Sequence, residues 1–160
     1  MSNAAGTIQE AEGRIHQFTT QSGADTIEVG RKLANLLAPP QLLILRGDLG
    51  TGKTTLVKGI AQALDAAEAD EVTSPTFTLI HEYDGSKDGK LVKLFHLDVY
   101  RLEGERQLET LGLDELLTHD ALVLVEWGEK FKSIRKKSTG EIAITSAGGD
   151  ARKITVTLKG

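Results

Sequence analysis

The stretch LLILRGDLGTGKTTLVKGIAQAL, residues 42–64, decides the fold. An apolar run precedes three glycines within six residues, and a Lys-Thr-Thr triplet then opens an amphipathic pattern. Gly47, Gly52, Lys53 and Thr54 fit the pattern G-x-x-x-x-G-K-[ST] between a strand and a helix. The backbone N–H groups of such a loop converge on phosphate oxygens, and the positive end of the following helix adds to the attraction. The pattern therefore predicts a nucleotide site.

Two carboxylates stand where this loop needs acidic partners. Lys53 supplies a mobile cation for the β- and γ-phosphates, and the Thr54 hydroxyl is a suitable hard oxygen for Mg²⁺. Asp98 ends the apolar run LVKLFHLD, and Glu126 ends ALVLVE. Because ligands collect at the carboxyl ends of parallel strands, we expect one carboxylate near the metal and the other near the attacking water. The alternative for each is a helix cap or a solvent-facing group.

Composition sets further limits. The chain has 160 residues, a net charge of −4 and no cysteine, which excludes a disulfide framework and a thiolate metal site and fits a cytosolic protein. There is no apolar run of membrane-spanning length and no signal-peptide pattern. We treat residues 1–13 as a flexible N-terminus and residues 14–160 as one domain. The basic stretch KFKSIRKKS, residues 130–138, is interpreted as a solvated loop.

Apolar strands interleave with helices along the chain, which favours an α/β single-domain P-loop NTPase. Its central sheet is expected to be mostly parallel, flanked by helices, with antiparallel edge strands. Expected helices cover residues 22–37, 54–64 and, as one or two short pieces, 103–119. Expected strands are 14–20, 41–47, two strands within 76–102 joined by the turn DGSKDG, 121–127, and a hairpin over 141–158.

Two further groups are weighed from the residues alone. Ser74 or Thr76, in TSPTFTL, could sense the γ-phosphate, although a strand start is the simpler interpretation. His96 lies on the same strand face as Asp98, two residues away, and is expected to pack near it or orient it. No third ligand for a histidine metal site is evident around His81, His96 or His119.

The segments GDLGTGKTT, SPTFTL, HLDVYRL and VEWGEK, in this order, resemble the TsaE (YjeE) family of tRNA threonylcarbamoyladenosine biosynthesis ATPases. The resemblance covers residues 14–158. It implies a P-loop fold, ATP and ADP binding, Mg²⁺-dependent hydrolysis that is weak alone, and action with the TsaB–TsaD pair. That pair makes the N6-threonylcarbamoyladenosine (t6A37) modification of tRNA. Because the chain is acidic overall, we expect it to reach tRNA indirectly, through the partner.

The resemblance also implies roles for individual residues. Lys53, Asp98 and Glu126 would be catalytic, and Thr54, Glu126 and Asp98 would bind Mg²⁺, with Glu126 the stronger candidate. Trp127 would lie beside the nucleotide. Phosphates would be held by Gly47, Asp48, Leu49, Gly50, Thr51, Gly52, Lys53, Thr54 and Thr55. Arg152 would approach the nucleotide, and Ser22 and Gly23 would lie against the adenine side.

Two other functions are compatible with the same phosphate loop. A small-molecule kinase would need an acceptor pocket and arginines in a mobile lid, for which Arg135 is the obvious candidate. A nucleotide-gated binding module would dock without turnover. The chain has no guanine-reading N-K-x-D segment, which favours ATP over GTP.

Overall fold

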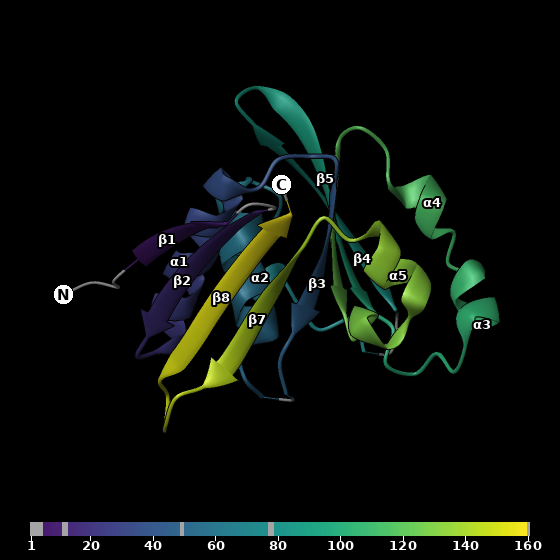
Figure 1. The fold of residues 1–160 in the computed structure, drawn as a ribbon. Coiled ribbons are helices and arrows are strands. Elements are labelled where there is room, and N and C mark those ends of the chain that lie inside the picture. The colour runs from purple at the N-terminus through teal and green to yellow at the C-terminus, as the bar shows by residue number, and fades with distance from the viewer. Residues whose placement is uncertain (1–4, 11–12, 49, 77–78, 160) are drawn as a thin grey trace.

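The computed structural model describes residues 5–10, 13–48, 50–76 and 79–159. In these residues eight strands form one sheet in the order β1-β2-β8-β7-β3-β6-β5-β4 (Figure 1). The strands are β1 Ala5–Glu10, β2 Gly13–Thr20, β3 Gln41–Arg46, β4 Ile80–Lys87, β5 Lys90–Asp98, β6 Ala121–Glu126, β7 Gly140–Ser146 and β8 Arg152–Lys159. The α-helices are α1 Gly23–Leu36, α2 Lys53–Ala63, α3 Glu105–Glu109, α4 Leu113–Leu116 and α5 Lys132–Lys137, with 3-10 turns η1 Ala69–Glu71 and η2 Gly128–Lys130.

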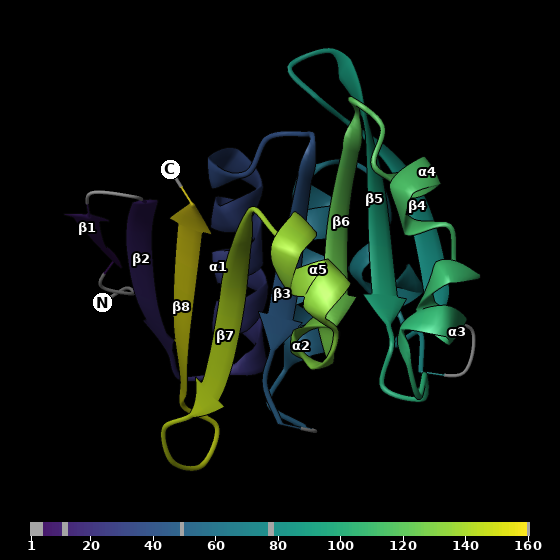
Figure 2. The same cartoon turned by 45° about the vertical axis from the view of Figure 1, so that its right-hand side comes forward.

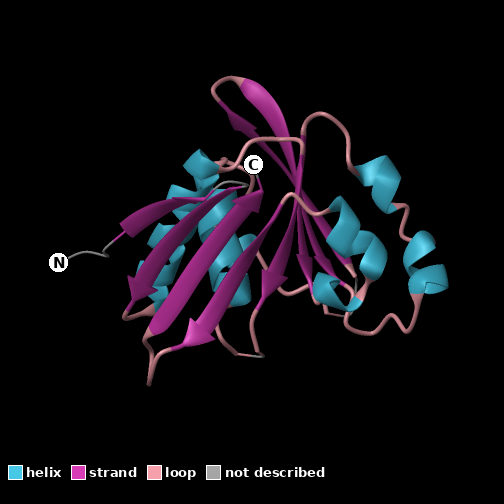
Figure 3. Ribbon diagram, in the orientation of Figure 1, coloured by secondary structure: helices cyan, strands magenta, loops and turns pink. Residues whose placement is uncertain are grey.

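The centre of the sheet is parallel and its outer parts are antiparallel. Strands β7, β3, β6 and β5 pair in parallel, whereas β1, β2 and β8 on one side and β4 on the other pair antiparallel with their neighbours. Helices α1 and α2 cover one face, and the short helices lie on the other (Figures 2 and 3). The α/β class predicted from the sequence is confirmed.

Strand β3 shows why this arrangement is stable. Its residues 42–45 are all buried, and successive side chains point to opposite faces of the sheet. Leu43 and Leu45 join the core under α1 and α2, while Leu42 and Ile44 join the core under α5. A strand buried on both sides needs an uninterrupted apolar run, as the sequence has here.

Strand β1 differs from the expectation for the N-terminal residues. We left residues 1–13 outside the fold, whereas residues 5–10 pair antiparallel with β2, from Ala5 opposite Phe18 to Glu10 opposite Gly13. The segment is short and polar, and an edge strand is held through backbone hydrogen bonds that place little demand on its sequence. Its composition therefore gave no strand pattern.

The hairpin β4–β5 turns later than the motif DGSKDG suggested. Strand β4 continues through Lys87, and the turn is the pair Asp88 and Gly89, with φ of 53° and 79°. Two residues in the left-handed region match the twist of the flanking strands, which is why Asp-Gly is favoured in such turns. The first Gly of the motif, Gly85, lies inside β4 against the end of α2, where a Cβ would stand 2.5 Å from the Leu64 carbonyl oxygen.

The basic stretch after β6 is also more ordered than expected. Residues 132–137 form helix α5, which docks through Ile134, a fully buried side chain. The expectation of a solvated loop was wrong because two apolar residues among the lysines, Phe131 and Ile134, are buried in the core and fix the short helix to the sheet. No helix in the described parts of the chain is long and apolar enough to cross a bilayer.

Helices α1 and α2 are in contact through two glycines, and this contact sets how closely α2 packs against α1. A Cβ on Gly30 would lie 2.3 Å from the Leu56 carbonyl oxygen, and one on Gly59 would lie 2.0 Å from the Ile27 carbonyl oxygen. Both distances fall far inside van der Waals contact, and the obstructing atoms belong to the backbone. The helices therefore approach at a distance that only glycine permits at these positions.

We predict that Gly59→Ala lowers the free energy of unfolding by about 2 kcal/mol, since overpacking outweighs the better helix propensity of alanine. Chemical denaturation by urea, followed by circular dichroism, measures the change. Gly104→Ala is the matched control, because Gly104 has an extended backbone with φ −166° and open space around it. Equal stability of the two variants would contradict the packing argument.

Candidate nucleotide and metal site

The loop between β3 and α2 has the geometry that its glycines predict. Gly50 and Gly52 have φ of 81° and 106°, in the region that favours glycine, and α2 starts at Lys53. The Asp48 carbonyl accepts hydrogen bonds from Thr51, from its N–H at 3.2 Å and its hydroxyl at 2.8 Å. Leu49, which we also assigned to the phosphates, lies outside the described residues. The loop thus curls tightly into the start of a helix.

Lys53 is buried at the mouth of this loop and has three partners. Its Nζ donates to the Gly47 carbonyl at 2.6 Å and lies 3.3 Å from Oε1 of Glu126. The same ammonium stands 4.9 Å from the centre of the Trp127 ring. A lysine that loses its water in this way needs compensating contacts, and a carbonyl, a carboxylate and an aromatic face provide them. The lysine side chain consequently joins the loop to the end of β6.

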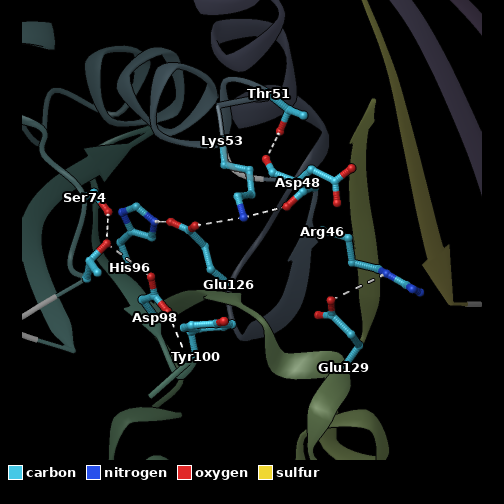
Figure 4. A network of polar contacts seen from close by, with 12 residues as sticks. Arg46, Asp48, Thr51, Lys53, Ser74, His96, Asp98, Tyr100, Glu126 and Glu129 are labelled. Atoms are coloured by element: carbon cyan, nitrogen blue, oxygen red, sulfur yellow. Dashed lines mark hydrogen bonds and ion pairs between the residues drawn. The ribbon is translucent and has the colours of Figure 1, made fainter. Parts of the chain in front are cut away.

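Glu126 lies between two cationic or donor groups. Its Oε1 faces Lys53, and its Oε2 is 2.6 Å from Nε2 of His96 (Figure 4). Burial on its own would raise the pKa of the Glu126 carboxyl, but the hydrogen bond from His96 and the positive charge of Lys53 outweigh it. The pKa of Glu126 is therefore lowered, and the group is a carboxylate at neutral pH.

Asp98 stands directly across from Glu126 in the paired strands β5 and β6. It accepts a hydrogen bond from the Tyr100 N–H at 2.9 Å, and the Thr76 hydroxyl lies 3.5 Å from its other oxygen. Ser74 and Thr76 share a hydrogen bond of 2.7 Å between their hydroxyls. Both proposed sensor hydroxyls therefore lie beside the acidic pair, on a segment that precedes β4.

These groups line one cavity of about 840 Å³. Its walls are formed by Gly50, Gly52, Lys53, Thr54, Thr55, Ser74, Thr76, Asp98, Tyr100, Arg101, Glu126 and Trp127. The structure thus brings together five of the predicted phosphate-loop residues, both carboxylates and Trp127 in one cavity wall.

The residues of this cavity fit a nucleotide with its metal. Gly50 and Gly52 line the cavity at the start of α2, where anions bind, and a Cβ on Gly50 would meet no atom within 4 Å. Among the described residues no group of three or more His, Asp or Glu side chains could hold a metal by itself. Mg²⁺ in phosphate-binding sites usually takes one or two carboxylates together with phosphate oxygens, and Thr54, Asp98 and Glu126 form a set of that kind.

Six of the described residues predicted to contact the nucleotide lie outside the cavity wall: Ser22, Gly23, Gly47, Asp48, Thr51 and Arg152. Arg152 donates from Nε to the Thr51 carbonyl at 2.8 Å, and its NH1 bonds the carbonyls of Gly149 and Ala151. It therefore stabilises the loop through the Thr51 carbonyl and does not line the cavity. Ser22 caps α1 by accepting from the Asp25 N–H at 3.1 Å, and Gly23 is the first residue of that helix. Direct contacts of Arg152, Ser22 and Gly23 with a nucleotide stay predictions.

The partner of His96 was misjudged from the sequence. We expected the imidazole to pack near Asp98, two residues along the same strand, or to orient it, but its hydrogen bond goes to Glu126 on the neighbouring strand. Residues two apart on a strand and diagonal neighbours on adjacent strands are both about 7 Å apart, so either carboxylate is within reach of a long side chain. The register of β5 against β6 decides this contact, and that register cannot be predicted from local sequence patterns.

Two wall residues were missed altogether. Tyr100 is 56% exposed, and its ring centre lies 5.0 Å from that of Trp127. Arg101 follows it in the cavity wall. Their position directly after Asp98, in the motif HLDVYRL, was the available signal, because residues that follow a strand end reach the same edge of the sheet.

Comparison with known proteins gives a consistent result. The family model described as threonylcarbamoyl adenosine biosynthesis protein TsaE matches residues 20–154. A Bacillus subtilis protein named tRNA threonylcarbamoyladenosine biosynthesis protein TsaE is 40% identical over 144 residues, covering 90% of this chain and 86% of the relative. A protein of the same name from Streptomyces coelicolor is 38% identical, with 81% and 88% covered. The crystal structure of Bacillus subtilis YdiB superposes with a TM-score of 0.64 at 30% identity, covering 99% of this chain and 90% of that one.

The lowered pKa of Glu126 predicts how stability depends on pH. Because the folded pKa lies below the ordinary 4.5, the unfolded chain takes up this proton more readily, and acid favours unfolding. The contribution is complete above the ordinary value and is lost as pH falls through the folded one. Unfolding free energies from about pH 3 to 7 should therefore rise more steeply below about pH 4.5 for the wild type than for Glu126→Gln. Parallel curves would contradict the assignment, since the other carboxyls are common to both proteins.

Proposed function

Because the chain belongs to the TsaE family of threonylcarbamoyl adenosine biosynthesis proteins, we propose that it binds and hydrolyses ATP with Mg²⁺ to support N6-threonylcarbamoylation of tRNA. The observation that carries the proposal is the meeting of the phosphate loop with two strand-end carboxylates around Lys53. Such a constellation combines a phosphate cradle, a cation and the oxygen ligands that phosphoryl transfer to water needs.

Each residue has a distinct task in this proposal. The loop backbone and Lys53 bind the phosphates, and Thr54 with Asp98 and Glu126 provides oxygen ligands for the metal or its water shell. Bound Mg²⁺ neutralises charge on the phosphate oxygens. When Lys53 turns to a phosphate it would leave Glu126, and one oxygen of Glu126 would then be free to accept a hydrogen bond from the attacking water.

Coupling to the modification enzyme follows from the position of the aromatic pair. Tyr100 and Trp127 both line the cavity, Trp127 lies against Lys53, and Tyr100 is largely exposed. A partner surface that touches this pair would have different affinities for the ATP and ADP forms, and such a difference is what couples hydrolysis to docking. We propose the TsaB–TsaD pair as that partner, with tRNA reached through it.

A kinase would need more arginines near the reacting phosphate than this cavity offers. Arg135, the candidate considered from the sequence, donates from NH1 to the Glu129 carbonyl at 2.6 Å and stands outside the cavity wall. Arg101 is the one arginine among the described wall residues. The geometry supports hydrolysis over transfer to a second substrate.

The test is phosphate release from Mg-ATP by the purified chain, alone and with the TsaB–TsaD pair. We expect slow release alone that rises when the pair is added. Fast release that ignores the pair would contradict the partner role. No release in either condition, with docking that still depends on ATP, would identify a binding module. Transfer of phosphate to a small molecule would identify a kinase.

Two substitutions separate binding from turnover. Lys53→Ala should reduce phosphate release by about 100-fold or more and weaken ATP binding, because it removes a cation from the phosphates. Glu126→Ala should lose a similar factor in release while the Kd for ATP changes by less than about threefold. Lys132→Ala, an exposed lysine on α5, is the matched control. Full turnover by Lys53→Ala would refute the site assignment.

A further inference from the structure

His96 is a fully buried histidine that reaches the cavity only through Glu126. It lies on β5 opposite Leu124 of β6, so Glu126 is its diagonal neighbour two residues further along. Its Nε2 stands 2.6 Å from Oε2 of Glu126, and His96 is not among the cavity wall residues. An imidazole in this place touches the back of the carboxylate, away from the side where a nucleotide would bind.

The other ring nitrogen of His96 has no partner. In the part of the chain that the structure describes, Nδ1 is buried without a hydrogen bond. A carboxylate can only accept, so Nε2 carries the proton that bonds Glu126. Burying an imidazole for a single hydrogen bond is costly. Among the described residues, the contact with Glu126 is therefore the polar interaction that explains a histidine here.

Lys53 cannot hold Glu126 throughout a reaction cycle. Its ammonium now bonds the Gly47 carbonyl and faces Oε1 of Glu126, but the same ammonium is the cation that the phosphates require. Once Lys53 turns to a phosphate, Oε1 loses its partner. The bond from His96 to Oε2 needs no such change, because it lies on the far side of the carboxylate.

We propose that His96 is a positioning residue: its Nε2–H holds Oε2 of Glu126, so that Oε1 keeps a fixed direction toward the metal or water when Lys53 moves to the nucleotide. The inference rests on the proposed role of Glu126 in hydrolysis. Partners behind a carboxylate fix its orientation in the same way around other metal sites, and their loss typically lowers activity by 10–100-fold.

Turnover of three variants tests the proposal. His96→Leu keeps a similar volume without a donor, His96→Gln can place an amide N–H near the position of Nε2, and His119→Leu repeats the substitution at an exposed histidine. We expect His96→Leu to lower kcat by about 10–100-fold with KM for ATP within about threefold, and His96→Gln to recover part of the loss. The control should match the wild type.

Several results would overturn the inference. The first is a kcat of His96→Leu equal to that of the wild type. The second is an equal loss of kcat in His96→Leu and His96→Gln, together with weaker binding of ATP in the absence of Mg²⁺. The second pattern would mean that His96 only supports the fold around the loop. Thermal unfolding of each variant shows whether it is folded, and if His96→Leu is not, the measurement on the nucleotide-free protein below decides.

A second measurement does not depend on turnover. Nitrogen-15 NMR of the nucleotide-free chain should show a slowly exchanging imidazole N–H, absent in His96→Gln and shifted or quickly exchanging in Glu126→Ala. If the wild type shows this signal but does not hydrolyse ATP, the proposed function fails while the contact that holds Glu126 stands. If the signal is missing, or is unchanged in Glu126→Ala, the positioning role fails even in an active ATPase.

Discussion

The ion pair between Lys53 and Glu126 is the contact on which the rest of the site depends. The two side chains are only 8% and 6% exposed, so both charges have lost most of their water. Burying such a pair is favourable only where further hydrogen bonds complete the shells of both groups. The Gly47 carbonyl and the Trp127 ring complete that of Lys53, and His96 completes that of Glu126. Replacing the pair with apolar groups would be a simpler way to gain stability, which points to a chemical reason for these charges.

The fold supplies the geometry of this contact from two directions. Parallel pairing of β5 and β6 aligns Asp98 with Glu126 at one edge of the sheet. The glycine contact between Gly30 and Gly59 sets the position of α2, and with it the position of Lys53 at the start of that helix. A shift of β6 by one residue would turn Glu126 to the other face of the sheet, because side chains alternate faces along a strand. A shift of α2 by one residue would turn the lysine position by about 100° around the helix axis.

What the sequence predicted, and what it missed, follows from the range of the interactions. The phosphate loop and helix α2 are local patterns, and the carboxylates at the ends of two apolar strands follow from a general rule for parallel sheets. The bond between His96 and Glu126 depends on the register of two strands whose residues are 30 positions apart, which no local pattern encodes. Helix α5 was missed because Ile134 gains its burial from the sheet, and its basic neighbours dominate the composition.

Under the proposed function, the shared use of Lys53 makes nucleotide binding and the release of Glu126 a single event. In the structure the ammonium contacts the Gly47 carbonyl and the Glu126 carboxylate. A nucleotide must offer Lys53 a stronger partner than these two, and a phosphate with several negative charges does so. The freed oxygen of Glu126 then needs a replacement partner, which the attacking water would supply. In such an ATPase, Glu126 would stay paired with Lys53 until the phosphates bind. A partner surface that displaced Trp127 from Lys53 would change how Lys53 divides between Glu126 and the phosphates. A docking partner beside the aromatic pair would control the rate of ATP hydrolysis in this way.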